Sequence, residues 1–294
     1  MRRRMSSGPV LVLAAATLWG TTGTAQALGP DGITPTSVAV IRMAGGATLL
    51  LYAVAVRRTV PIRTMWGWPL AVAIFTMAAS QPLFFSGVAR TGVAVGTIVT
   101  IGSGPILAGG IAWAVRRERV GSRWVVATVV SLLGAVFLVS GGEAAGVDGV
   151  GVGLNLAAGL VWAIYLTAAK QLLDEHPPVF VAAVVFTGAA ILLSPGLFIA
   201  SPAWVATGRG IAVVLWLTLA ATAISYILFA HGLRGTPVAT AATLTLAEPV
   251  TAAILGMTIL DEPARATTIL GITLVAAGLL TLAREQPPEP VPDV

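Results

Sequence analysis

Two residues of opposite charge, Glu248 and Arg42, lie inside long apolar stretches of this 294-residue sequence. A charged side chain at membrane depth is costly, so it is expected to face the interior of a helix bundle and to be paired or to line a wet cavity. Two interpretations follow. Either Glu248 and Arg42 form a static ion pair, or Glu248 binds the amine of a substrate while Arg42 holds its carboxylate.

Two prolines occupy corresponding places in the two halves of the sequence, Pro105 and Pro249. Each lies near the middle of an apolar run and removes the hydrogen-bond donor for the carbonyl four residues earlier, which belongs to Ile101 or Thr245. Matched interruptions of this kind indicate the binding site of a transporter. We predict helix breaks at a cavity, with packing kinks satisfied by a neighbouring Ser or Thr as the alternative.

Aromatic and polar side chains near mid-membrane extend this candidate site. Trp19 and Trp162 lie far from the interfaces where membrane tryptophans usually gather, so each indole needs a partner or a wet cavity. Packing in the core is the alternative. Tyr165 shares a helical face with Trp162. The substrate-binding residues that we predict are Trp19, Arg42, Gln81, Thr100, Trp162, Tyr165, Tyr226 and Glu248.

The composition requires lipid as the solvent of these residues. The chain is 56% hydrophobic and 10% charged, whereas an ordinary soluble domain is about 25% charged. A bilayer core needs roughly 20 apolar residues per helix. We therefore predict an all-α, polytopic membrane protein with ten transmembrane helices at 9–28, 35–56, 66–88, 93–115, 122–141, 150–172, 178–200, 210–232, 237–260 and 264–283.

The two halves resemble each other at an offset of 143 or 144 residues. Five spans in each half return the chain to the opposite side, so the second half enters the membrane inverted. We predict two inverted five-helix repeats, 1–145 and 146–284, and a disordered cytoplasmic tail, 285–294. The matched pairs include Trp19 with Trp162, Arg90 with Arg234, Pro105 with Pro249, Glu118 with Glu262, and Gly134 with Gly278.

The distribution of basic residues predicts the orientation. Thirteen Lys and Arg residues fall on the side of the N-terminus, and the other side has only Arg90, Arg209 and Arg265. This bias places both termini in the cytoplasm. The predominance of arginine over lysine, with abundant Ala, Gly and Val, indicates a GC-rich bacterial genome and hence the bacterial plasma (inner) membrane.

Several motifs resemble the EamA-type drug/metabolite transporter superfamily. Residues 246–250 (LAEPV) and 260–263 (LDEP) resemble its closing signature, and Gly104-Pro105 with 117–119 (RER) form the counterpart in the first half. Residues 18–20 (LWG) and 41–43 (IRM) also match the family pattern. This resemblance covers nearly the whole chain. It implies ten helices around a central cavity, and export or exchange of small metabolites such as amino acids.

A secondary transporter working by alternating access is therefore the predicted function, and a structural or sensory membrane subunit is the alternative. An intramembrane enzyme is disfavoured because the usual catalytic motifs are missing. The chain has no cysteine, and its two histidines are far apart, so we expect no metal and no cofactor. The predicted partners are a small-molecule substrate and the lipid bilayer, with protons as a candidate coupling ion and no nucleic acid. Monomer and homodimer stay open.

Three charged residues at the ends of apolar runs are interpreted separately. Glu118 and Glu262 mark the beginnings of the fifth and tenth helices, where a carboxylate favours the helix dipole. We interpret both as structural. Lys170 closes the sixth run, and it either snorkels to the surface or faces the mouth of the cavity.

Overall fold

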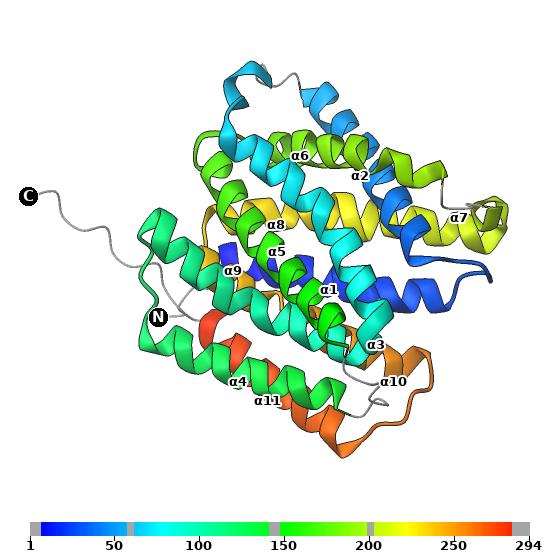
Figure 1. Cartoon of the computed structure of the whole chain (residues 1–294), viewed down its shortest axis with the longest axis vertical. Coiled ribbons are helices and arrows are strands. Elements are labelled where there is room, and N and C mark those ends of the chain that lie inside the picture. The colour runs from blue at the N-terminus through cyan, green and yellow to red at the C-terminus, as the bar shows by residue number, and fades with distance from the viewer. Residues whose placement is uncertain (1–6, 58–61, 141–147, 199–202, 284–294) are drawn as a thin grey trace, which may run out of the picture.

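The computed structural model of the chain describes residues 7–57, 62–140, 148–198 and 203–283 (Figure 1). Within these ranges every regular element is helical. The longer helices are α1 (Ser7–Ala27), α2 (Pro35–Arg57), α3 (Trp68–Arg116), α4 (Ser122–Val139), α5 (Gly149–Glu175), α6 (Pro178–Leu193), α7 (Gly208–Leu215), the π-helix η4 (Trp216–Ile224), α8 (Ser225–Arg234), α9 (Val238–Leu244), α10 (Ala247–Ile259) and α11 (Ala266–Ala283). Short 3₁₀ helices are η1 (Ile62–Met65), η2 (Ser194–Phe198) and η3 (Ala203–Ala206).

These elements combine into ten helices of membrane length. α3 consists of two helices joined at Gly92, where φ is 79° and the backbone is not helical. α7, η4 and α8 follow one another without a gap, whereas α9 and α10 are separated by a break at Thr245 and Leu246. Some predictions fall outside the described residues. These are the tail at 285–294, the boundary between 145 and 146, and the positions of Arg2, Arg3, Arg4, Arg58 and Arg284.

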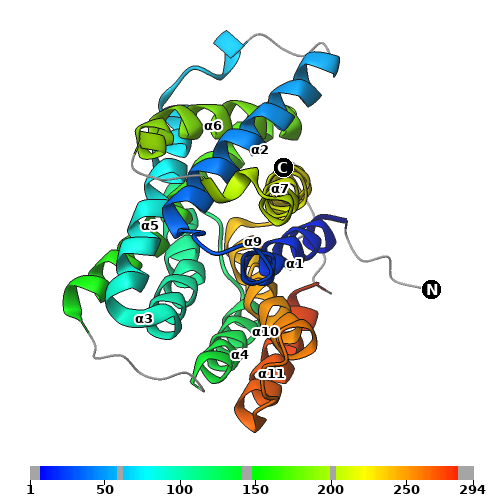
Figure 2. The same cartoon turned by 90° about the vertical axis from the view of Figure 1, so that its right-hand side faces the viewer.

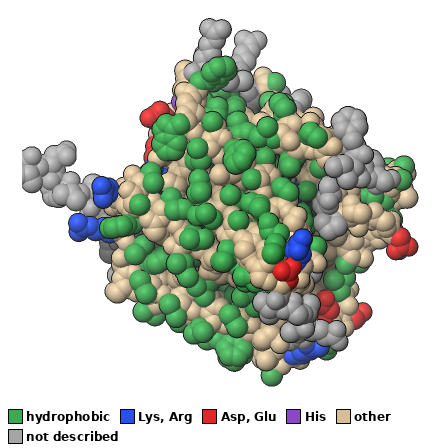
Figure 3. Space-filling model, in the orientation of Figure 1, with side chains coloured by type: hydrophobic (Ala, Val, Ile, Leu, Met, Phe, Trp, Pro, Cys, Tyr) green, Lys and Arg blue, Asp and Glu red, His purple; other side chains and the backbone are tan. Residues whose placement is uncertain are grey.

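Eight of the helices in the described ranges are long and apolar enough to cross a membrane. α1 and α2, with 21 and 23 residues, also have the length to span, since about 20 residues cross the hydrocarbon core. Large apolar side chains such as Phe75, Trp113 and Ile191 are exposed on the outside of the bundle. Figure 3 shows one broad apolar face with charged side chains mainly towards its left edge and its lower right part. Contact with lipid explains this surface.

Most helices of one half of the chain pack against helices of the other half. α3 and α5 pack together on one side of the molecule, and α1 packs with α8 and α10 on the other (Figure 2). α2 pairs with α6 at one edge of the molecule, and α4 pairs with α11 at the opposite edge (Figures 1 and 2). Since the first helix of each half packs on the third and fourth spans of the other half, the pattern is the one expected of two inverted repeats.

Glycines allow the closest of these contacts. A Cβ added at Gly134 in α4 would lie 2.7 Å from the backbone nitrogen of Val275 in α11, and one added at Gly271 would lie 2.7 Å from the carbonyl oxygen of Gly134. Small residues are the usual means by which membrane helices bring their backbones together. The α4–α11 pair therefore depends on glycine at both positions.

Candidate functional site

Four of the predicted aromatic residues meet in one cluster at the centre of the bundle. The ring of Trp19 in α1 lies 5.8 Å from Trp162 in α5 and 4.9 Å from Tyr226 in α8, between ring centroids. Trp162 stacks on Tyr165 at 5.2 Å. Phe229, whose ring is 5.1 Å from Trp19, and Phe186, whose ring is 4.3 Å from Tyr226, also belong to this central aromatic cluster and were not predicted.

The indole of Trp19 is buried, and its N–H is hydrogen-bonded. Its Nε1 donates a hydrogen bond of 2.9 Å to Ser225 Oγ, and Ser225 in turn donates to the carbonyl oxygen of Thr222 at 3.1 Å. A buried indole N–H normally requires such an acceptor. The cluster is therefore connected by hydrogen bonds to the π-helix η4.

Arg42 binds this π-helix directly. Its Nε donates to Thr222 Oγ1 at 3.2 Å, and its Nη2 donates to the carbonyl oxygen of Ala221 at 3.3 Å. The wider turns of a π-helix change the usual backbone pairing and occur frequently at functional sites. Gly45 and Gly46, one turn further along α2, allow this approach, because a Cβ at Gly46 would lie 3.2 Å from Thr222 Cβ. The Arg42 guanidinium is thus held against η4.

Glu248 lies where the ninth span is interrupted. α9 ends at Leu244 and α10 begins at Ala247, so the carboxylate belongs to the first turn of a new helix. A Cβ at Gly20 would lie 2.5 Å from the carbonyl oxygen of Glu248, which places this turn against α1 beside Trp19. The Glu248 side chain is half-buried.

The structure does not show the predicted ion pair as a direct contact. Among the hydrogen bonds and ion pairs of the described residues, none engages the carboxylate of Glu248. Arg42 and Glu248 lie within electrostatic reach of each other, and both lie within reach of the buried Tyr226 hydroxyl. Arg42 and Glu248 therefore lie in one region of the bundle, and the described hydrogen bonds and ion pairs leave the carboxylate oxygens of Glu248 available.

The two prolines differ in their surroundings. The helix continues through Pro105, whereas the break in the second half comes just before Pro249. The predicted helix break is therefore present at one of the two positions. Pro249 has no N–H to donate to the carbonyl oxygen of Thr245, four residues earlier. This oxygen instead accepts a hydrogen bond of 2.9 Å from the backbone nitrogen of Glu248. A tighter turn has supplied the donor that the proline removes.

Two predicted residues have polar contacts outside the cluster. Thr100 Oγ1 donates to the backbone oxygen of Asn155 at 3.1 Å, and Asn155 Nδ2 donates to Thr91 Oγ1 at 3.1 Å. Because Asn155 is fully buried, Thr100 contributes to packing between α3 and α5. The Gln81 amide donates to the neighbouring Ser80 Oγ at 3.5 Å.

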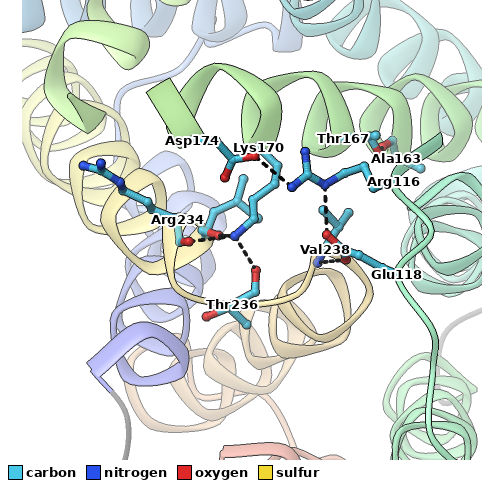
Figure 4. A network of polar contacts seen from close by, with 10 residues as sticks. Arg116, Glu118, Ala163, Thr167, Lys170, Asp174, Arg234, Thr236 and Val238 are labelled. Atoms are coloured by element: carbon cyan, nitrogen blue, oxygen red, sulfur yellow. Dashed lines mark hydrogen bonds and ion pairs between the residues drawn. The ribbon is translucent and has the colours of Figure 1, made fainter. Parts of the chain in front are cut away.

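A second polar network lies at the end of the bundle where α5 and α8 finish (Figure 4). Lys170 neither snorkels nor faces open space, since it is 7% exposed and donates to the carbonyl oxygens of Leu233, Arg234 and Thr236 at 2.7, 2.7 and 3.2 Å. Glu118 accepts a hydrogen bond from the backbone nitrogen of Val238. Its carboxylate therefore caps α9 instead of the fifth span, a long-range contact that sequence position alone does not reveal.

An inverted pair of five-helix repeats with a discontinuous helix is the architecture of many membrane transporters. The chain belongs to the EamA-like transporter family, whose model matches residues 6–140 and 149–284. This membership makes it a multi-pass membrane transporter of small molecules and sets the enzyme alternative aside.

The relatives are bacterial transporters. The chain is 42% identical over 275 residues to the uncharacterized transporter YwfM of Bacillus subtilis, covering 93% of each protein. It is 31% identical over 290 residues to the threonine/homoserine exporter RhtA of Escherichia coli, covering 93% of this chain and 88% of that protein. A protein crystal structure of 19% identity superposes with a TM-score of 0.83 over 95% of this chain and 99% of the other, which shows a shared fold.

Proposed function

We propose that this protein exports or exchanges small zwitterionic metabolites, such as amino acids, across the bacterial plasma membrane by alternating access. The observation that carries the proposal is the placement of Arg42 and Glu248 in one region beside the central aromatic cluster. Opposite charges at mid-membrane match the two charges of an amino acid.

The bonding state of the two side chains supports this proposal. A guanidinium has five N–H donors, and the described contacts of Arg42 use Nε and Nη2. The remaining donors suit the planar, two-oxygen geometry of a carboxylate. The carboxylate of Glu248, at the start of α10, is suited to accept hydrogen bonds from a substrate ammonium group.

The relatives support the same substrate class. RhtA exports threonine and homoserine according to its name, and both are zwitterions with a small polar side chain. The tryptophan and tyrosine rings of the cluster provide apolar walls, and the tyrosine hydroxyls provide polar tips for a substrate hydroxyl group.

The orientation is also part of the proposal. The bias of Lys and Arg places both termini in the cytoplasm. The N-terminus of α1 packs against residues 232–236, since a Cβ at Gly8 would lie 2.7 Å from Thr236 Oγ1. The end containing Lys170 is accordingly the cytoplasmic end.

Reconstitution into liposomes tests the function. Protein-dependent counterflow of labelled amino acids, abolished in Arg42→Gln and unaffected in a surface variant such as Arg265→Gln, is the expected result. Transport confined to uncharged or singly charged solutes would contradict the zwitterion assignment. Repeating the assay with and without a pH gradient separates proton coupling, in which the gradient accelerates flux, from facilitated exchange.

A further inference from the structure

The network around Lys170 connects the two helix bundles at the cytoplasmic end. Lys170 extends from α5 and binds the last carbonyl groups of α8 and the turn that follows it. A cation at the C-terminal end of a helix is favoured by the unpaired carbonyls and by the helix dipole. α5 belongs to the bundle with α3, and α8 belongs to the bundle with α1, so this ammonium group bridges the two.

Arg116 and Glu118 form a second bridge beside the first. Arg116 Nη2 contacts Asp174 in α5 at 2.8 Å, and Arg116 Nε contacts Glu118 at 2.9 Å. The other oxygen of Glu118 accepts from the backbone nitrogen of Val238, at the start of α9, at 2.9 Å. The end of α3, the end of α5 and the beginning of α9 are thereby joined in one chain of charge-assisted hydrogen bonds.

The repeat identifies the positions that correspond to this network at the outer end. The carboxylates recur, because Glu118 matches Glu262 at an offset of 144 and Asp174 matches Asp31 at an offset of 143. The cations do not recur, because Lys170 matches Ala27 and Arg116 matches Leu260. Within the described parts of the chain, neither Glu262 nor Asp31 has a side-chain hydrogen bond or ion pair.

The packing of the helices is asymmetric in the same sense. α5 packs against α8 and α9, and its contacts through Lys170 lie at the cytoplasmic end. The corresponding pair at the outer end is α1 and α3, and these two helices have at most marginal contact among the described residues. The end with the cations is thus the end at which the bundles are closed.

We infer that Lys170, together with Arg116 and Glu118, is a lock that keeps the unloaded transporter closed towards the cytoplasm, and that the outer end has no equivalent lock. Opening to the cytoplasm requires the ammonium group to leave its three carbonyl acceptors. Lys170 acts here as a positioning residue for the helices and does not touch the cargo. The inference rests on alternating access in the proposed function, but not on which solute is carried.

Cysteine accessibility tests the lock, since the natural chain has no cysteine and one introduced thiol is unique. Thr167, which is 4% exposed, lies one turn from Lys170 on the same face of α5. Its counterpart at an offset of 143 is Thr24 in α1, which is 7% exposed. Thr167→Cys therefore reports on opening to the cytoplasm, and Thr24→Cys reports on opening to the outside.

In each reporter background, Lys170→Met removes the charge and the donors but keeps an unbranched side chain. In inside-out vesicles without substrate, we expect maleimide labelling at position 167 to rise about tenfold or more, because one hydrogen bond from a charged donor contributes at least that factor to an equilibrium. Labelling at position 24 in right-side-out vesicles is expected not to rise, since the two openings exclude each other.

Arg90→Gln is the matched control, because it removes one cation and one ion pair, the 3.1 Å contact with Asp148, at the outer end. It should leave both labelling rates unchanged. An unchanged rate at position 167, or a rise at both positions, would overturn the lock, since general loosening exposes both sites together. Should Lys170→Met fail to fold, Glu118→Gln replaces it in the same labelling experiment, with the same expected result and the same two results that would overturn the lock. Transport is not measured, so failure of the substrate assignment would leave this result standing.

Discussion

Replacement of Arg42 by glutamine tests whether its guanidinium recognises a carboxylate. In the structure Arg42 donates hydrogen bonds of 3.2 and 3.3 Å to Thr222 and Ala221, which are long for N–H···O contacts. Glutamine keeps an N–H for one of these acceptors but loses the charge. A hydrogen bond to a charged group contributes about 1.5–3 kcal/mol. Loss of a forked contact with a substrate carboxylate, partly offset by a neutral bond, therefore costs about 2–4 kcal/mol, or roughly 30- to 700-fold in affinity.

The assay compares an amino acid with its carboxamide in proteoliposome counterflow. The natural protein is expected to prefer the amino acid, and Arg42→Gln is expected to lose this preference while carboxamide transport is retained. Arg42→Lys should fall between the two, because a single ammonium group cannot serve the π-helix and a carboxylate in a fork. If transport of the amino acid and the carboxamide fell in parallel, Arg42 would act only by holding η4 in place, and recognition of the carboxylate would be refuted.

Three further predictions concern the carboxylate, the packing and the end of a helix. Glu248→Gln should abolish discrimination between an amino acid and the hydroxy acid that lacks its amine, and in the same counterflow assay full retention would remove Glu248 from recognition. Gly134→Val should destabilise the α4–α11 pair by about 1–3 kcal/mol through overpacking, seen as a lower thermal midpoint in detergent, whereas Gly110→Ala, which has open space, should not. Asp148 has its pKa held below 3.8 by the Arg90 guanidinium and the Val150 N–H. Because the folded-state pKa is lowered, its stabilisation exists at neutral pH and is lost as pH falls below about 4. The protection factor of the Val150 amide against hydrogen exchange, which corrects for the intrinsic pH dependence of exchange, should therefore fall there, and an Asp148→Asn protein should show no such change in protection.

The apolar runs alone were sufficient to predict ten helices, because backbone groups in hydrocarbon must satisfy one another within each segment. The duplication was visible in the matched Trp, Arg, Pro and Glu residues, and five spans per half require inversion. Local departures from regular α-helix could be recognised only in the structure. Pro105 and Pro249 look equivalent in sequence, but only the second follows a break, and the π-helix before Ser225 has no proline or glycine to indicate it.

The candidate site divides in the same way. Trp19 and Trp162 were predicted from their depth in the membrane, Tyr165 from its helical face and Tyr226 from its capacity to form hydrogen bonds. All four lie in one cluster. The residues that hold this cluster, Ser225 and Thr222, are small polar side chains in an alanine-rich run, where such residues commonly bond their own helix. Nothing in their spacing shows that one accepts from Trp19 and the other from Arg42.

The sequence by itself determined which segments cross the membrane and how the halves are related, because both depend on local hydrophobicity and on counting spans. It also predicted which charged residues lie at mid-depth. Only the tertiary structure decided the partners of those charges. Lys170 binds carbonyl groups more than 60 residues away, and Arg42 binds η4 some 180 residues away. Such contacts depend on which helix faces come together, and in an apolar bundle packed through small residues many faces are equally plausible from the sequence alone.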